Sequence, residues 1–293
     1  MKSWPGLLLR SMRPRQWIKN LVLFAGLAFD RQLLHRPAFE RTFAGFLLMC
    51  LASGTVYLIN DIADRSQDRH HPLKRNRPIA SGQLPVSVAL VTAVVLAPVS
   101  VGLAYLLSPS FAALLLGYLA LNLAYSFYLK HIAIVDALAV AAGFVLRVGG
   151  GVLLIQVERF SPWLYVCMTL LALFISFGKR RAELALLVDS AKDHRPVLNG
   201  YTIPLLDTYM EIVCAATILA YSLYTFSAPN LPENHSMMLT IPFVLFGVFR
   251  YLYLLQVEKS GGAPEDVLMA DRPLQVTILL WGLSAMILLY LQP

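Results

Sequence analysis

Charged residues are scarce in this sequence, because Lys, Arg, Asp and Glu together make up only 14% of its 293 positions. A soluble domain of ordinary composition has about a quarter of such residues. The mean hydropathy is +0.64, and 58% of the residues are hydrophobic. This composition excludes an ordinary soluble protein and indicates one that lies largely within a lipid bilayer.

Cysteine is also rare, and the three that occur, Cys50, Cys167 and Cys214, each lie inside an apolar stretch. An odd number of cysteines without metal-ligand spacing excludes a disulfide framework and a zinc site, so we expect them to be packing residues. The apolar run at residues 6–9 is too short for the core of a signal peptide. We therefore expect the N-terminus to be retained.

Most of the chain consists of long apolar runs, not the alternating ten-residue segments that build a membrane barrel. A helix needs about 20 mostly apolar residues to cross a membrane, and short polar or Pro/Gly-marked breaks separate the runs. The sequence therefore predicts an all-α, polytopic protein. The predicted spans, about nine in number, are residues 17–35, 40–60, 86–107, 110–128, 132–154, 161–178, 207–226, 238–257 and 274–291.

Lys and Arg are divided unequally between the two sides of the membrane that nine crossings define. One side carries 18 of the 24, and the other carries only Arg31, Arg36, Arg41 and Arg159. Basic residues accumulate on the cytoplasmic side of membrane proteins. We therefore expect the N-terminus and the segment after the second span to be cytoplasmic.

Three aspartates follow the second predicted span in the motif Asn60-Asp61-x-x-Asp64-x-x-x-Asp68. Their spacing places the three carboxylates on one face of a helix, within about 60° of arc. Clustered carboxylates repel one another unless cations neutralise them, and Mg²⁺ is usually held by one or two carboxylates together with substrate phosphates. The motif therefore predicts a site for Mg²⁺ and a diphosphate. The alternative is a solvated acidic helix end paired with neighbouring arginines.

Residues 70–82 contain prolines and Gly82, which predict an ordered loop. We expect its basic residues to reach a diphosphate held by the aspartates. His70 and His71 are adjacent, so their side chains point in different directions, and no third metal ligand is evident. We interpret both histidines as loop residues.

The acidic motif and residues 77–82, Arg-Pro-Ile-Ala-Ser-Gly, together resemble the UbiA-type intramembrane prenyltransferase superfamily. That superfamily is known for nine transmembrane helices, the same aspartate motif after the second helix and an Arg-Pro-Ile-x-x-Gly loop. The resemblance covers essentially the whole chain. It implies a UbiA-like helical bundle in a single transmembrane domain, residues 1–293, with loops 61–85 and 179–206 forming a cap over the active site.

Other segments resemble the decaprenyl-phosphate phosphoribosyltransferase branch of the superfamily. They are residues 11–20, Ser-Met-Arg-Pro-Arg-Gln-Trp-Ile-Lys-Asn, residues 178–184, Gly-Lys-Arg-Arg-Ala-Glu-Leu, and residues 195–201, Arg-Pro-Val-Leu-Asn-Gly-Tyr. General prenyltransferases have a second aspartate motif where this sequence has Lys179-Arg180-x-x-Glu183. Cations there suit direct binding of a phosphate. An alternative stays open, in which Asp189 and Asp193 act as the second motif.

The resemblance implies Mg²⁺-dependent transfer of 5-phosphoribosyl from 5-phosphoribosyl 1-diphosphate to a polyprenyl monophosphate, decaprenyl or similar, for an arabinofuranose donor of cell-wall arabinan. It implies a bacterial inner membrane, an active site facing the cytoplasm, contact with membrane lipids and no nucleic-acid partner; a homo-oligomer is left open. The residues implied for metal binding and catalysis are Asn60, Asp61, Asp64 and Asp68, and those for the substrates are Lys19, Lys74, Arg77, Lys130, Lys179, Arg180, Arg181, Glu183 and Tyr201.

Two other functions compete with this one. An aromatic prenyltransferase of quinone or haem biosynthesis needs the second aspartate motif, which is not clearly present. A transporter of anionic solutes would place its substrate near the midplane between repeated helices, whereas no internal repeat is evident.

Asp136 and Arg147, three turns apart in the fifth predicted span, are functional candidates because ionisable groups are costly inside a membrane. Arg147 could equally be a structural partner for a neighbouring helix.

Overall fold

The computed structural model describes residues 4–70, 74–155, 161–187, 196–228, 231–258 and 264–291, and every regular element in these ranges is helical. The predicted all-α, multi-pass fold is confirmed. Within the described residues, eight helices are long and apolar enough to cross a membrane: Arg36–Ala63, Val86–Leu107, Pro109–Phe127, Val135–Leu154, Pro162–Ala185, Ile203–Ser227, Ser236–Gln256 and Arg272–Leu291.

The first predicted span, residues 17–35, is not one continuous helix, and the count of nine is therefore not confirmed. This part of the chain forms η1, a 3-10 helix (Pro14–Leu23), followed by the short α2 (Phe24–Phe29). At the junction of these two helices the packing is close, a feature that the hydropathy pattern does not contain. Gly151 approaches η1 so closely that a Cβ added to it would lie 1.8 Å from the Leu23 carbonyl oxygen. The helical segment then ends before Arg31, whose φ is 56°.

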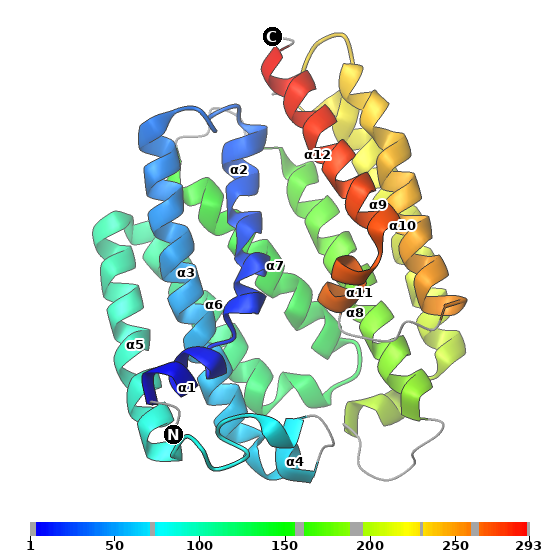
Figure 1. The fold of residues 1–293 in the computed structure, drawn as a ribbon. Coiled ribbons are helices and arrows are strands. Elements are labelled where there is room, and N and C mark those ends of the chain that lie inside the picture. The colour runs from blue at the N-terminus through cyan, green and yellow to red at the C-terminus, as the bar shows by residue number, and fades with distance from the viewer. Residues whose placement is uncertain are drawn as a thin grey trace. The chain divides into compact units, whose positions relative to one another are not determined.

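The chain folds into two compact units. Unit 1 contains α1 (Trp4–Ser11), η1, most of α2, α3 (Arg36–Ala63), α4 (Arg65–His70), η2 (Lys74–Asn76), α5 (Val86–Leu107), α6 (Pro109–Phe127), most of η3 (Leu129–His131) and the second half of α7 (Val135–Leu154). In this unit α3 packs against η1, α5 and α6 (Figure 1). A core around Phe111, Leu115 and Tyr118 joins these helices.

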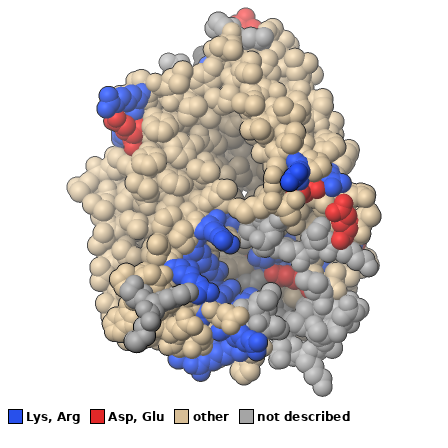
Figure 2. Space-filling model, in the orientation of Figure 1, with Lys and Arg blue, Asp and Glu red and all other residues tan. Residues whose placement is uncertain are grey.

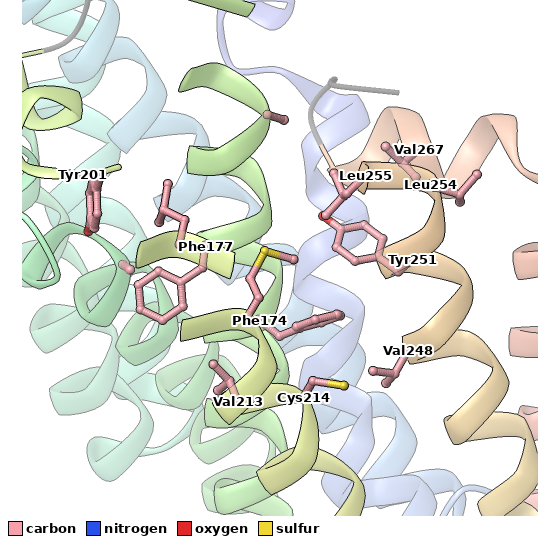
Figure 3. Close-up of a cluster of buried hydrophobic side chains, with 14 of the residues drawn as sticks. Phe174, Phe177, Tyr201, Val213, Cys214, Val248, Tyr251, Leu254, Leu255 and Val267 are labelled. Atoms are coloured by element: carbon pink, nitrogen blue, oxygen red, sulfur yellow. The ribbon is translucent and has the colours of Figure 1, made fainter. Parts of the chain in front are cut away.

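Unit 2 contains the first half of α7, α8 (Pro162–Leu187), η4 (Pro196–Gly200), α9 (Ile203–Ser227), η5 (Ser236–Thr240), α10 (Ile241–Gln256), α11 (Pro264–Ala270) and α12 (Arg272–Leu291). Its largest core joins α8, α9 and α10 around Phe174, Phe177 and Tyr251, and includes Tyr201 (Figure 3). Gly178 allows the close approach of α8 and α10, because an added Cβ would lie 2.8 Å from Leu255 Cδ1.

Several helices begin where the sequence has a capping residue and a proline, which is favourable in the first turn. Ser108 Oγ accepts a hydrogen bond from the Phe111 amide at the start of α6. Thr202 Oγ1 accepts one from the Leu205 amide at the start of α9. These local signals explain why the predicted and observed starts of α6 and α9 agree within a few residues. The sixth predicted span, residues 161–178, is too short at its C-terminal end, because α8 continues through the polar residues 179–184 to Leu187.

Candidate functional site

The acidic motif lies at the junction of α3 and α4 in unit 1. Asp61 is in the last turn of α3, Asp64 follows that helix with φ −89° and ψ 4°, and Asp68 is in α4. The Asp64 amide donates to the Asn60 carbonyl and the Asp68 amide to the Asp64 carbonyl, over 2.9 and 2.8 Å. The helical turn therefore continues through the break, although the motif does not lie on one uninterrupted helix.

Each carboxylate of the motif contacts a cation. Arg77 Nη1 bridges Asp61 Oδ1, at 3.1 Å, and Asp68 Oδ2, at 2.6 Å. Lys130 Nζ donates to Asp64 Oδ1 over 2.5 Å. Asp61 also forms an ion pair with Arg13. The structure thus brings five of the predicted site residues together and adds Arg13, to which the sequence interpretation gave no role although it lies in a segment that carries the resemblance.

The loop after α4 is folded so that Arg77 faces the aspartates. Arg69 Nε donates to the Ala80 carbonyl over 3.2 Å, and the Leu84 amide donates to the Pro78 carbonyl over 2.9 Å. Gly82 has φ 78°, a conformation that glycine adopts without steric cost. This ordered turn agrees with the loop predicted there. His70 was predicted to be a loop residue, but it is the last residue of α4, with Nδ1 2.9 Å from the Ser66 carbonyl oxygen. His71 lies outside the described residues.

Basic side chains surround the motif in unit 1. Figure 2 shows Lys and Arg gathered around the place where α4 lies in Figure 1. The exposed arginines of α1, η1, α4 and η2 include Arg10, Arg15, Arg69 and Arg75. Lys74 and Lys19 are both partly buried, on η2 and η1. The region can therefore bind an anionic group, whereas its aspartates can bind a cation.

The donor set fits Mg²⁺. Within the described residues, no group of three His, Cys, Asp or Glu side chains converges as a ready-made metal site. Mg²⁺ does not require one, since it is usually held by one or two carboxylates, water and substrate phosphates. In addition, Asn60 Oδ1 is buried without a hydrogen-bond partner among those residues. A metal ion or its water ligand would satisfy this oxygen.

A second polar network lies in unit 2. Arg180 is buried, with 3% of its surface exposed. Its Nε donates to Asp136 Oδ2 over 2.5 Å and its Nη1 to Glu183 Oε2 over 2.7 Å. The Tyr201 hydroxyl donates to Asp136 Oδ1 over 2.7 Å and accepts a hydrogen bond from the Ile134 amide. Asp136 therefore connects Arg180 and Tyr201, two residues that the sequence assigned to substrate binding.

This network has two unusual features. Ile134 has φ 70°, a rare conformation for a β-branched residue, and the Tyr201 hydroxyl holds its amide. Burial of Tyr201 raises the pKa of its phenol, and the hydrogen bond to Asp136 raises that pKa further, well above the ordinary value of 10. Tyr201 therefore stays protonated and keeps donating to Asp136 at physiological pH.

The cations at residues 179–181 are accompanied by carboxylates from elsewhere in unit 2. Arg181 Nε donates to Asp207 over 2.5 Å, as Arg180 does to Asp136. Lys179 is partly buried. The sequence interpretation treated this stretch as cations that replace carboxylates and did not find these partners. The alternative motif at Asp189 and Asp193 lies outside the described residues.

Arg147 lies in the part of α7 that belongs to unit 1. Its Nε donates to Asn20 Oδ1 over 2.8 Å and its Nη2 to the Tyr118 hydroxyl over 2.7 Å. Asn20 in turn donates to Ser53 Oγ over 3.1 Å. These bonds join η1, α3, α6 and α7, so the structural interpretation of Arg147 agrees with its contacts.

Comparison with known proteins decides the family. The model of the UbiA prenyltransferase family matches residues 21–265. The chain belongs to this family. It is 34% identical to the decaprenyl-phosphate phosphoribosyltransferase of Corynebacterium glutamicum over 98% of this chain and 87% of that protein. It is also 34% identical to the protein of the same name from Mycobacterium tuberculosis over 93% of this chain and 90% of that protein.

Solved structures of the family have the same fold. A UbiA homolog from Archaeoglobus fulgidus bound to GPP and Mg²⁺ superposes with a TM-score of 0.75, covering 97% of this chain and 99% of that one at 18% identity. The same homolog bound to DMAPP and Mg²⁺ gives a TM-score of 0.74 at 17% identity. At these identities the likeness describes the fold of this UbiA family member and not its substrates.

Proposed function

We propose that this protein transfers 5-phosphoribosyl from 5-phosphoribosyl 1-diphosphate to a polyprenyl monophosphate and releases diphosphate. The observation that carries the proposal is the 34% identity, over 98% of this chain, to a relative named decaprenyl-phosphate phosphoribosyltransferase. The acidic motif and its surrounding cations suit a donor that carries both a diphosphate and a further phosphate. By the same likeness, the product serves arabinan synthesis for a bacterial cell wall.

The unit 1 network would bind the diphosphate of the donor. Asp61, Asp64 and Asp68 would hold Mg²⁺, with Asn60 orienting it or a water ligand. When bound, Mg²⁺ supplies positive charge that stabilises the diphosphate as it leaves. Arg77, Lys74 and Lys130 would add hydrogen bonds to the diphosphate oxygens, and preorganised donors of this kind favour the transition state in which the charge develops.

The transfer needs no strong general base, because the acceptor phosphate is already an anion at neutral pH. One of its oxygens would form a bond to the anomeric carbon of the ribose, while the bond between that carbon and the diphosphate oxygen breaks. Attack from the face opposite the diphosphate inverts the anomeric carbon. The residues of the site therefore act by binding and orienting two anions that would otherwise repel each other.

The resemblance also assigns basic residues of unit 2, and of the N-terminal segment, to phosphate binding. Lys179, Arg180 and Arg181 are assigned to the 5-phosphate of the donor or the phosphate of the lipid. Glu183 and Tyr201 keep the Arg180 guanidinium in a fixed orientation through the hydrogen bonds described above. Lys19, on η1 beside the partly buried Trp17, is assigned to the headgroup of the acceptor.

A direct assay tests this function. Membranes that contain the protein are supplied with 5-phosphoribosyl 1-diphosphate, Mg²⁺ and decaprenyl phosphate, and the lipid product is identified by mass spectrometry. We expect a phosphoribosyl lipid and released diphosphate, with loss of both when the metal is chelated. A parallel assay supplies a prenyl diphosphate and an aromatic acceptor. Formation of a prenylated aromatic product without any phosphoribosyl lipid would overturn the proposal.

A further inference from the structure

The carboxylates of the acidic motif are balanced by cations of unit 1 itself. Asp61 and Asp68 have side chains that are only 3% and 4% exposed, and they have little contact with water. Charges at such positions need partners, because removing a carboxylate from water is costly. The ion pairs are Arg13 with Asp61, Arg77 with Asp61 and Asp68, and Lys130 with Asp64. Three carboxylates thus contact three cations.

Arg13 is the cation of this set that can leave most easily. Its side chain is 27% exposed, against 7% for Lys130; that of Arg77 is 26% exposed, but Arg77 is held by two carboxylates whereas Arg13 is paired with Asp61 alone. Arg77 bridges Asp61 and Asp68, so both carboxylates keep a cation when Arg13 is absent. Arg13 also lies between α1 and η1 with φ 55°, a conformation that is unfavourable for a residue with a side chain.

Hydrogen bonds hold the C-terminal part of η1 in place. A movement of the Arg13 side chain away from Asp61 would therefore involve only the start of η1. Asn20, seven residues after Arg13, accepts a hydrogen bond from Arg147 and donates to Ser53. The guanidinium of Arg13 packs over the ring of Tyr57, with 4.8 Å between its central carbon and the ring centroid. Arg13 therefore has a nearby surface along which its side chain can shift without displacement of η1.

A free Mg²⁺ ion meets an unfavourable site under these conditions. It would have to displace a guanidinium from Asp61, and it would add two positive charges to a balanced cluster. A diphosphate removes both the excess positive charge and the cost of displacing the guanidinium. It supplies negative charge for the metal, and it offers the displaced guanidinium a pair of phosphate oxygens, which suit the fork of an arginine side chain.

We propose that Arg13 is a resident counter-ion of Asp61 that yields its place to Mg²⁺ and then binds the diphosphate, so that metal and diphosphate bind tightly only together. This inference rests on the proposed function in one respect, namely that a diphosphate enters unit 1. Coupling of this kind is reciprocal, since each ligand raises the affinity of the other by the same factor.

The first arm of the test measures metal binding without diphosphate. Purified full-length protein in lipid nanodiscs is titrated with Mn²⁺, and free Mn²⁺ is followed by its paramagnetic resonance signal. We expect Arg13→Gln to bind Mn²⁺ about tenfold more tightly than the wild type, because the competitor for Asp61 is gone. An affinity that is unchanged or weaker in Arg13→Gln would overturn the proposal.

The second arm measures binding of radiolabelled inorganic diphosphate at saturating Mg²⁺. Arg13→Gln should bind it about tenfold more weakly than the wild type, because the diphosphate has lost its guanidinium partner. Arg13→Lys keeps the charge but not the fork, so it should retain wild-type Mn²⁺ affinity and still bind diphosphate more weakly. Arg13→Lys decides the question if Arg13→Gln fails to fold; wild-type affinity for diphosphate in Arg13→Lys would then contradict the proposal.

Arg15 provides a matched control. It is an exposed arginine of the same segment, without an ion pair or hydrogen bond to another described residue. Arg15→Gln removes the same charge from the basic region without touching Asp61, so it should leave the Mn²⁺ affinity unchanged and weaken diphosphate binding far less than Arg13→Gln does. Equal effects of the two substitutions would mean that overall charge, not Arg13, is responsible. Failure of the wild type to bind diphosphate would contradict the proposed function instead. The Mn²⁺ affinities of the wild type and Arg13→Gln would still show whether Arg13 competes with the metal for Asp61.

Discussion

Tyr201 and Asp136 are 65 residues apart in the chain and meet through a hydrogen bond of 2.7 Å, in which the Tyr201 hydroxyl donates to Asp136 Oδ1. The same hydroxyl accepts the Ile134 amide, and the other oxygen of Asp136 accepts from Arg180. One phenol therefore joins the segment before α9 to the start of α7 and, through Asp136, to Arg180 of α8.

Removal of that hydroxyl should destabilise the protein and reduce its activity. Tyr201→Phe removes the acceptor of the Ile134 amide and the donor to Asp136 Oδ1 at a buried position, while Asp136 Oδ2 keeps its bond to Arg180. An unsatisfied buried group of this kind costs about 1–3 kcal/mol. We expect a lower midpoint of thermal unfolding in detergent and a higher KM for the donor, since Arg180 loses its fixed orientation. Tyr209→Phe is the control, because Tyr209 packs on Phe177 and has no hydrogen bond through its hydroxyl to a described residue. Equal effects of the two substitutions would contradict this prediction.

The stability of the wild type should fall at alkaline pH in a way that Tyr201→Phe does not share. Burial and the hydrogen bond to Asp136 raise the pKa of Tyr201 in the folded state, so the neutral phenol stabilises the fold fully below the unfolded-state pKa of about 10. Above that pH the unfolded state loses the proton more readily, and the contribution declines. The difference in unfolding midpoint between wild type and Tyr201→Phe should therefore narrow from pH 9 to pH 11. A constant difference would show that the phenol does not titrate as described.

Asp61→Asn should lower kcat about 100-fold or more while the protein remains folded. The substitution keeps the shape of the side chain but removes the charge that the two arginines contact and that would hold Mg²⁺ in the proposed function. Glu40→Gln is the control on the same helix, where an exposed Glu40 pairs only with Arg36 among the described residues. Turnover by Asp61→Asn near the wild-type level would remove Asp61 from the metal site.

Gly151→Ala should destabilise unit 1 by roughly 1–3 kcal/mol or more, because the new Cβ would lie 1.8 Å from the Leu23 carbonyl oxygen and the backbone must move. Gly117→Ala in α6 is the matched control. No atom lies within 4 Å of a Cβ built at Gly117, and alanine favours the helix there. The two variants are compared by unfolding them in detergent while circular dichroism records the loss of helix. A Gly151→Ala protein as stable as the wild type would contradict the close contact.

The spans were largely predictable from the sequence, because hydropathy and helix-starting residues act locally. Ser108 and Thr202, each close to a proline, mark the starts of α6 and α9 in the sequence itself. There are two exceptions. The sixth predicted span ended at residue 178, whereas α8 continues to Leu187. In residues 17–35 the structure has η1 and α2. At the junction of η1 and α2, Gly151 packs closely against Leu23, and no window of neighbouring residues contains such a contact.

The aspartate motif and the loop with Arg77 were likewise evident from spacing and resemblance. By itself the sequence determined an all-α membrane protein of the UbiA family with this acidic cluster, since helix periodicity places nearby carboxylates together. Only the tertiary structure decided which cation meets which carboxylate. Arg13 reaches Asp61 across 48 residues and Arg180 reaches Asp136 across 44. Pairs so distant in the chain form through the packing of whole helices, so the residue pattern near either partner does not specify them.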